Sequence, residues 1–422
     1  MKIFNKIQKT GIALALMALS FNACNKLDLD AVPNAAATPS TLPTLATLLD
    51  DANFSLLKAA VTKAGLMPTL ANASLRFTVF APDDAAITAS LTPLLPPGVT
   101  PAFYIANVLT AADAKSLISY HVIPQAITAS SIASSFPNFQ YPSILNPAPT
   151  VSPLLRLTTF PSKRGAFAWV NNIPVTAVDI LASNGVVHKV ARIVQPPSTD
   201  LWNRISTDAE LTYLKAAIQR ADSGVAAGSR LQDAVDIASN PSSIGANLTI
   251  FAPTDAAMKT FITGAITQAL VAQGLPAAIA FGQATFLVNT YGTLLLTNPG
   301  AISGALAAAL SPTTVKGLVA YHIVAAQSGT YAPPGVRVFS VNLPTSATQV
   351  KTLLNSAIAA HPGLTVQATF APSLPVVAAA TVKGAANATA SNILISFTPP
   401  FTSDLHHING VLHKIDQVLL PQ

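Results

Sequence analysis

The chain has 422 residues, of which half are hydrophobic and 9% are charged. Soluble proteins typically carry about a quarter of charged residues, so this composition predicts a globular chain with a large apolar core. The formal net charge is +6, and it falls to +3, with 20 basic against 17 acidic residues, once Lys2, Lys6 and Lys9 are removed with a leader segment. Nucleic-acid binding requires clustered Lys and Arg, so we expect no nucleic-acid partner.

The first residues have the order of an export signal. Three lysines precede an apolar run of 11 residues, Gly11–Phe21. This run is too short to span a bilayer, which needs about 20 residues. The pattern is typical of a signal peptide, here over residues 1–23.

Cys24 follows this run and is the sole cysteine of the sequence. A small residue before a cysteine at this place resembles a bacterial lipobox and predicts that Cys24 is lipidated. An ordinary signal peptide with an incidental cysteine stays open. Residues 24–44, rich in Pro, Ala and Thr, are predicted to be a tether. We therefore expect an outer-membrane lipoprotein of the bacterial cell envelope, on the periplasmic or the external face, that contacts the membrane through its lipid.

Four landmarks occur twice in the same order, which predicts a duplicated domain. The spacing between landmarks grows in the second copy, so that copy contains insertions. We predict domains over 45–197 and 208–422, with insertions around 260–315 and 345–400. The matching segments are 57–61 with 214–218, 77–86 with 248–257, 120–122 with 321–323, and 184–190 with 409–415.

The landmarks also predict secondary structure. Thr78-Val79-Phe80 and its second copy are β-branched and aromatic, as in strands, and the following Pro82 and Pro253 end them. Asp83 and Thr254 suit helix N-caps. Asp84 and Asp255 lie in the first turn, where a carboxylate interacts favourably with the positive end of the helix dipole. Asn-Gly pairs at 184 and 409 suit hairpin turns. Strands mixed with helices predict an α+β fold.

These landmarks resemble the fasciclin family. The strand-to-helix segment TVFAPDDAA, the Tyr-His pairs Tyr120-His121 and Tyr321-His322, and the segments NGVVHKV and NGVLHKID match its motifs in family order. The resemblance implies two tandem domains, each a wedge-shaped β-sandwich with flanking helices. It also implies adhesion through homophilic contacts or through protein or glycan partners at the cell surface, without catalysis and without a cofactor.

The repeated histidines allow two interpretations. His121, His188, His322 and His413 could be buried structural residues whose ring nitrogens satisfy backbone groups. Alternatively, the two Tyr-His pairs form a binding surface, as the family resemblance implies. Asp84, Asp255, His188 and His413 are assigned to the structural motif.

Metal binding and catalysis are not expected. His406, His407 and His413 could suggest a zinc site, but adjacent histidines on a strand point to opposite faces, and neither Cys nor Glu lies nearby. The sequence contains no HExxH, G-x-S-x-G, P-loop or G-x-G-x-x-G motif. We therefore predict no metal ligands and no catalytic residues. Trp169 lies in an apolar strand pattern and is expected in the core.

Residues 260–315 contain 56 residues without a charged side chain. They fall where the second copy is longer, and two interpretations stay open. They can form an enlarged set of buried helices, which is the simpler one, or helices that also expose an apolar patch for a partner, because large exposed apolar patches usually mark contact sites. Three functions follow as hypotheses: a surface adhesion lipoprotein, a scaffold component of an envelope complex that docks through this insertion, or a carbohydrate-processing enzyme.

Overall fold

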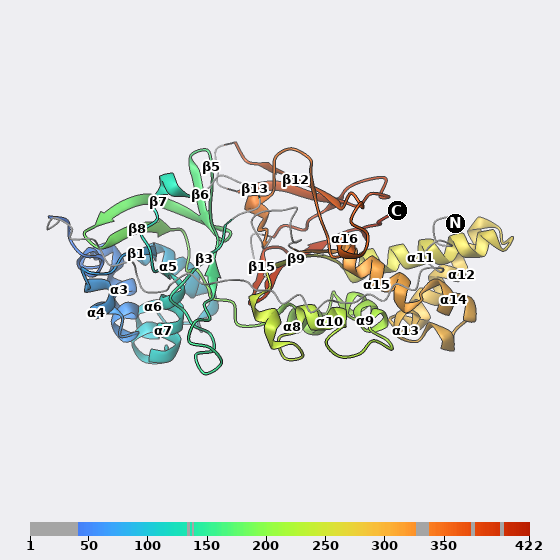
Figure 1. The fold of residues 1–422 in the computed structure, drawn as a ribbon, viewed down its shortest axis with the longest axis horizontal. Helices are drawn as coiled ribbons and strands as arrows, with labels where there is room; N and C mark the ends of the chain where they lie inside the picture. Colours follow the sequence, from blue (N-terminus) through green and yellow to red (C-terminus); the bar gives the residue numbers. More distant parts are fainter. Residues whose placement is uncertain (1–40, 133–135, 137–138, 326–336, 373–375, 397–400) are drawn as a thin grey trace.

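The computed structural model describes residues 41–132, 136, 139–325, 337–372, 376–396 and 401–422. It confirms the predicted α+β class, with two domains in which helices flank β-sheets (Figure 1). The predicted signal peptide, Cys24 and most of the tether lie outside the described residues. The chain completes domain 1 before it enters domain 2. The strands that carry the repeated motifs have the same arrangement in both domains.

Domain 1 is built on a six-stranded sheet in the order β2-β1-β8-β7-β6-β5. Its central strands β1 and β8 are parallel, and their neighbours are antiparallel. β7 pairs with both β8 and β6, and two shifts of register along β7 bend the sheet. The strands are β1 (Phe77–Pro82), β2 (Val122–Ile123), β5 (Pro161–Arg164), β6 (Phe167–Val170), β7 (Ile173–Ala182) and β8 (Gly185–Val190), with β3 (Tyr141–Pro142) and β4 (Thr158–Thr159) as a separate pair.

Short helices cover one side of this sheet. Asp83 begins α5 as predicted, because its carboxylate accepts from the amide of Ala86 at 2.9 Å. The apolar faces of α3 and α7 pack in one buried cluster with β1. The helices of domain 1 are α2 (Leu45–Leu48), α3 (Ser55–Lys63), α4 (Met67–Ala71), α5 (Asp84–Leu91), α6 (Pro101–Phe103) and α7 (Ala111–Tyr120).

Domain 2 repeats the central strands and adds a second sheet. The order β10-β9-β16-β15 reproduces β2-β1-β8-β7, again with a parallel central pair. The second sheet, β11-β12-β13-β14, lies in the predicted insertion at 345–400, and side chains of both sheets share one buried cluster. The strands are β9 (Leu248–Pro253), β10 (Ile323–Val324), β11 (Thr348–Val350), β12 (Leu364–Phe370), β13 (Val377–Lys383), β14 (Ser391–Asn392), β15 (Leu405–His407) and β16 (Gly410–Ile415).

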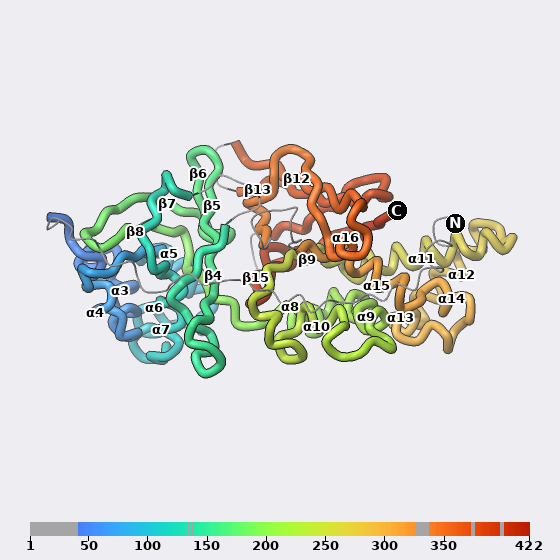
Figure 2. The backbone as a smooth tube through the Cα atoms, viewed as in Figure 1, coloured from blue at the N-terminus to red at the C-terminus, as the bar shows by residue number. Residues whose placement is uncertain are grey.

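Nine α-helices lie in the described part of domain 2. Thr254 caps α11 through the amide of Ala257 at 3.3 Å, as predicted. The path of the chain through these helices can be followed in Figure 2. They are α8 (Leu201–Thr207), α9 (Thr212–Ala221), α10 (Leu231–Val235), α11 (Asp255–Ala272), α12 (Ala277–Tyr291), α13 (Leu294–Thr297), α14 (Gly304–Ala309), α15 (Pro312–Tyr321) and α16 (Leu354–Ala357).

The second domain begins earlier than the predicted residue 208. Leu201 and Ile205 of α8 are fully buried in the domain 2 core. The amide of Leu201 donates to Asn409 Oδ1 at 3.0 Å, as the amide of Leu45 donates to Asn184 Oδ1 at 2.8 Å in domain 1. α8 is therefore the counterpart of α2, and it lies in the interval 198–207 between the two predicted domains.

The glycine after each of these asparagines is required by close packing of two strands. A Cβ at Gly185 would lie 2.0 Å from the carbonyl oxygen of Phe77, and one at Gly410 would lie 2.6 Å from that of Leu248. No side chain fits at these distances, so the parallel pairing of the central strands depends on glycine.

Candidate binding site

Both Tyr-His pairs lie inside the domains. Tyr120 and Tyr321 end α7 and α15, and all four side chains are at most 2% exposed. His121 Nδ1 donates to the carbonyl of Leu117 at 2.8 Å, and its Nε2 accepts from the amide of Val194 at 2.9 Å. Burial lowers the pKa of His121 to about 4, so the ring is neutral at pH 7 and can accept this hydrogen bond.

The second pair repeats this geometry. His322 Nδ1 lies 2.8 Å from the carbonyl of Leu318, Nε2 accepts from the amide of Leu419 at 2.9 Å, and burial lowers its pKa to about 4. The tyrosine hydroxyl donates to the carbonyl of Gly363 at 2.6 Å in domain 2, and to that of Thr158 at 2.8 Å in domain 1. Because neither pair reaches the surface, this geometry argues against the binding interpretation and favours the structural one.

The histidines of the repeated segments 184–190 and 409–415 also form hydrogen bonds with backbone groups. His188 Nε2 lies 2.8 Å from the carbonyl of Ile127, and its Nδ1 accepts from the amide of Asp179 at 3.2 Å. In domain 2, His413 makes the same two contacts with Val338 and Asp404. Both aspartates have a positive φ, 58° and 55°, which a short polar side chain tolerates. Each histidine therefore fixes an irregular backbone position, at Asp179 within β7 and at Asp404 just before β15.

Asp84 and Asp255 have a role beyond the predicted interaction with the helix dipole. Asp84 Oδ1 accepts from the amide of Leu56 at 2.8 Å, and Oδ2 accepts from the hydroxyl of Ser55. Asp255 accepts in the same way from Tyr213, at 2.9 Å, and from Thr212. One carboxylate thus connects the starts of two helices. The sequence analysis did not predict this contact. The signal that could have indicated it is a hydroxyl residue at the same place of both repeats, Ser55 and Thr212.

The three histidines considered for a metal have separate partners. His406 Nε2 accepts from Arg337 at 2.9 Å, His407 Nδ1 lies 3.2 Å from the hydroxyl of Thr199, and His413 holds the backbone as described. Burial lowers the pKa of His406 and of His407. Within the described ranges, no group of three or more His, Cys, Asp or Glu side chains is arranged to hold a metal ion.

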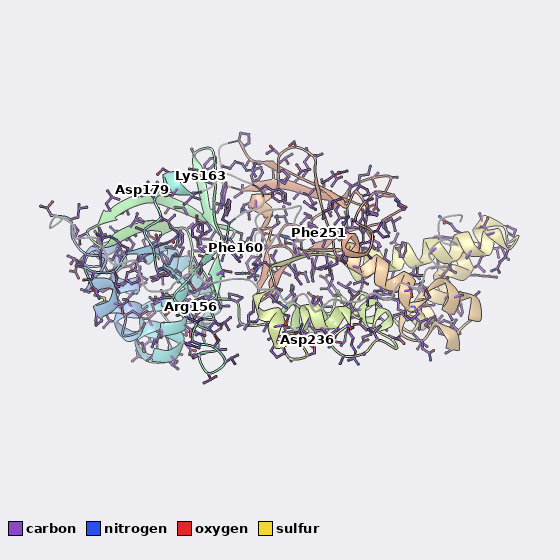
Figure 3. All side chains as sticks on the ribbon, in the orientation of Figure 1. Arg156, Phe160, Lys163, Asp179, Asp236 and Phe251 are labelled. Carbon is purple, nitrogen blue, oxygen red and sulfur yellow. The ribbon has the colours of Figure 1, made fainter. Side chains whose placement is uncertain are left out.

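The two domains meet in a buried contact that the sequence did not predict. Phe160 and Trp169 of domain 1 share a cluster with Phe339 and other domain 2 residues, and Figure 3 shows Phe160 between the domains. The guanidinium of Arg337 lies 5.1 Å from the centre of the Phe160 ring. Trp169 is 1% exposed, so the prediction that it is a core residue is confirmed.

Arg337 is 2% exposed and bonds to backbone carbonyls. Its Nη2 donates to Ile408 at 2.8 Å and to Ala246 at 3.1 Å, and its Nη1 donates to His407 at 3.1 Å. Burial lowers its pKa to about 10, so the group stays charged at pH 7. Carbonyl dipoles and the Phe160 ring stabilise the cation, and the junction is thereby fixed from the domain 2 side.

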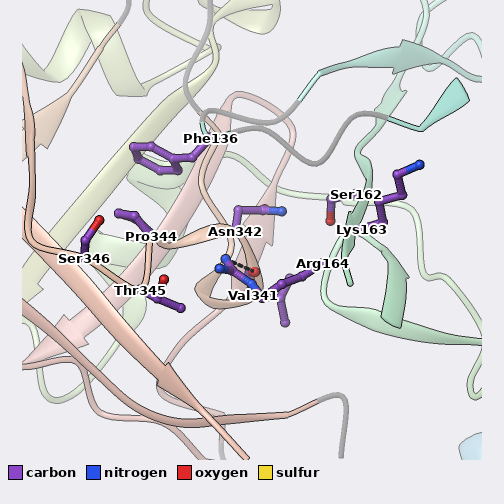
Figure 4. A pocket seen from close by; sticks show the side chains of 9 residues that line it. All are labelled: Phe136, Ser162, Lys163, Arg164, Val341, Asn342, Pro344, Thr345 and Ser346. Atoms are coloured by element: carbon purple, nitrogen blue, oxygen red, sulfur yellow. Dashed lines mark hydrogen bonds between the residues drawn. The ribbon is translucent and has the colours of Figure 1, made fainter. Parts of the chain in front are cut away.

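Arg164 fixes the junction from the domain 1 side. It ends β5, its Nη2 donates to the carbonyl of Leu343 at 2.7 Å, and its guanidinium lies 4.1 Å from the centre of the Phe370 ring. Burial lowers the pKa of this guanidinium. A hairpin of domain 1 is thus held against domain 2, where Arg164 Nη2 also lies 3.4 Å from the carbonyl oxygen of Val341 and donates to it (Figure 4).

Two cavities of about 180 and 300 Å³ are both lined by Arg164, and we refer to them together as the junction groove. One side carries hydroxyl and amide groups, and the other carries aromatic rings. Such a combination suits a polar ligand with a flat apolar face, such as a sugar. The lining residues are Phe136, Ser162, Lys163, Arg164, Val341, Asn342, Pro344, Thr345 and Ser346 on the first side, and Gly165, Ala166, Phe167, Trp169, Phe370, Ala371 and Pro372 on the second.

The chain belongs to the fasciclin family. The family model for the fasciclin domain matches residues 52–196. Protein sll1483 of the cyanobacterium Synechocystis is 30% identical over 188 residues, which cover 44% of this chain and 92% of that protein. Domain 2 lies outside the residues matched by the family model, but it repeats the central strand order and both histidine arrangements of domain 1.

Two further similarities are more limited. Transforming growth factor-beta-induced protein ig-h3 from pig is 30% identical over 168 residues, and the rabbit protein is 32% identical over 161; the matches cover 37% and 38% of this chain and 20% of each relative. The solved FAS1 domain pair from the insect cell adhesion molecule Fasciclin I aligns with 89% of this chain and 95% of that chain, at 12% identity and a TM-score of 0.29.

Proposed function

We propose that this protein is a lipid-anchored binding protein of the bacterial cell envelope, which contacts a surface glycan or protein partner through the junction groove. Family membership supports a binding role, and the similarity to a protein of Synechocystis supports a bacterial source. The observation that carries the proposal is the groove itself: a cation, hydroxyl groups and aromatic rings from two domains surround two cavities at a fixed junction.

The binding interpretation fits the groove better than catalysis does. Hydrolysis of a glycoside typically uses a pair of carboxylates. Among the described residues that line the two cavities there is no Asp, Glu or His. No observation on the described residues therefore favours the carbohydrate-processing alternative. The scaffold alternative has one observation in its favour, because several aromatic side chains of the domain 2 insertion are exposed.

The binding proposal can be tested with purified protein on intact cells of the producing bacterium. We expect Arg164→Gln and Phe370→Ala each to weaken binding roughly tenfold, since both remove a charged or aromatic contact from the groove. Arg156→Gln is the matched control, because Arg156 donates to the local carbonyls of Pro153 and Leu155. Undiminished binding by both groove variants would exclude the groove as the contact.

A second variant separates loss of contact from loosening of the domains. Ser346 is exposed and lines the groove from domain 2, so Ser346→Trp fills the first cavity while leaving Arg164 in place. We expect this variant to bind as weakly as Arg164→Gln and to unfold at the same urea concentration as the wild type.

The proposed anchor and location need their own experiment. Metabolic labelling with a fatty-acid analogue should mark the wild type and not Cys24→Ser, and equal labelling of both would rule out lipidation at this residue. Protease treatment of intact cells then distinguishes the external face, where the domains are digested, from the periplasmic face, where they are protected.

A further inference from the structure

Helices α11 and α12 form a hairpin that projects at one end of the molecule, beyond the body of domain 2 (Figure 1). Large apolar side chains are exposed on this hairpin and directly after it. Phe286 is 64% exposed, Phe281 58% and Ile279 53%. The others in this set are Val271, Tyr291 and Leu294.

These side chains are not needed to close the core. Ile266 is the last buried residue of α11, and the helix continues to Ala272, about 9 Å further at 1.5 Å per residue. α12 packs on α11, and its buried residues are Ala280, Ala284 and Val288. Small side chains let the two helices approach closely, while Phe286 and Ile279 point away from this contact.

The hairpin also differs from the rest of the surface in charge. Residues 260–315 contain no charged side chain, and lysines bound this stretch on both sides. Lys259 is exposed one turn into α11, and Lys316 lies in α15, where its Nζ donates to the carbonyl of Ser229 at 3.3 Å. Acidic groups lie near this base as well: Asp255 in the first turn of α11, and Asp222 close enough to Lys316 for the lysine to act on its pKa.

We propose that the tip of the α11–α12 hairpin inserts into the interfacial region of a lipid bilayer. Interfacial helices bury their apolar face about 5–10 Å into the boundary between headgroups and acyl chains, and the projection beyond Ile266 has this length. In the described part of the chain, no helix has the length and apolar character required to cross a membrane, so the insertion is shallow.

A lipid surface explains the hairpin better than a protein partner does. Protein interfaces are enriched in Arg, and they match the shape of a partner with a polar rim. Beyond Lys259 the hairpin carries no charged side chain, and its tip exposes the apolar side chains of Val271, Ile279 and Phe281 beside the amides of Gln268 and Gln273. The interfacial region of a bilayer accepts apolar and amide groups without a complementary pocket, and Lys259 at the base can meet lipid phosphates. The inference does not depend on lipidation of Cys24.

The test uses single cysteine residues in the full chain carrying Cys24→Ser, since Cys24 is the sole natural cysteine. An environment-sensitive fluorophore is attached at Ile279→Cys, a 53% exposed position near the start of α12, or, as control, at Phe103→Cys, which is also 53% exposed and lies in domain 1. Vesicles of phosphatidylcholine, alone or with phosphatidylglycerol, are then added. We expect a blue shift at position 279 with both vesicle types and no shift at position 103.

A second variant tests the apolar contact itself. In the labelled Ile279→Cys chain, Phe281→Gln should raise the vesicle concentration needed for half the shift roughly tenfold. Leu94→Gln, a 71% exposed position in domain 1, should leave it unchanged. No shift at position 279 with folded protein overturns the proposal. So does a shift that grows with protein concentration without vesicles, which shows pairing of two copies, or one that needs added envelope proteins, which shows protein docking.

Discussion

Acid should unfold this protein through its buried histidines, and His121 allows the effect to be measured. Its Nε2 accepts a hydrogen bond from the amide of Val194 at 2.9 Å, and protonation at Nε2 would remove that acceptor. The folded pKa is about 4, against an ordinary value of 6.5. Between these values the unfolded chain binds more protons than the folded chain, so stability rises with pH and is lost as the pH falls from about 6.5 toward 4.

The magnitude follows from the difference between the two pKa values. At about 1.4 kcal/mol per pH unit, lowering the pKa from 6.5 to about 4 links about 3 kcal/mol of the free energy of unfolding to this one residue. The steepest slope attributable to it is therefore about 1.4 kcal/mol per pH unit, between pH 5 and pH 6. His322 has the same lowered value and adds a similar dependence for domain 2.

The assay is urea unfolding at a series of pH values, followed by the fluorescence of Trp169 in a Trp202→Phe background. We expect His121→Gln to lose about 1–3 kcal/mol at pH 7, through the weakened hydrogen bond, and to show a smaller dependence on pH than the parent. Ser90→Ala is the matched control, because Ser90 Oγ accepts from the neighbouring amide of Ile193 at 3.1 Å and does not titrate. If His121→Gln keeps the slope of the parent, the linkage to this histidine is refuted.

Two further predictions concern domain 2 and are read from urea midpoints at pH 7. Asp255→Ala should lower its free energy of unfolding by about 1.5–3 kcal/mol, because the start of α9 loses a charged acceptor; an unchanged midpoint would contradict this role. Gly410→Ala should destabilise domain 2 by about 1–3 kcal/mol, since its Cβ would collide with the carbonyl of Leu248. Gly264 lies in open space within α11, so Gly264→Ala should instead stabilise domain 2 by about 0.5–1 kcal/mol. The two alanine substitutions must therefore change the free energy of unfolding in opposite directions.

The sequence predicted the features that depend on near neighbours in the chain. Asp83 and Thr254 begin helices because each side chain reaches an amide three residues ahead. Pro82 ends a strand because it has no amide hydrogen to donate. The repeat followed from comparing the chain with itself, the α+β class from its mixture of strand and helix patterns, and the family from the resemblance of the repeated motifs.

The sequence also left open whether the Tyr-His pairs face the surface or the core. The motif is the same in either case, and the choice depends on what covers it. In the structure, the amide of Val194, 73 residues from His121, completes the histidine's hydrogen bonds inside the domain. Burial of this kind is a property of the packed domain and is not visible in the local pattern.

The junction and the projecting hairpin were decided by tertiary structure alone. Arg164 of domain 1 meets Leu343 of domain 2 across 179 residues, and Arg337 of domain 2 meets the ring of Phe160 of domain 1. No local preference of an arginine predicts such a partner, since the contact exists only after both domains have folded and met. Similarly, the absence of charge in residues 260–315 predicted apolar helices, but it did not predict which of their side chains are exposed to solvent. Phe286 is exposed because the adjacent helix face, with Ala284 and Val288, already fills the contact with α11.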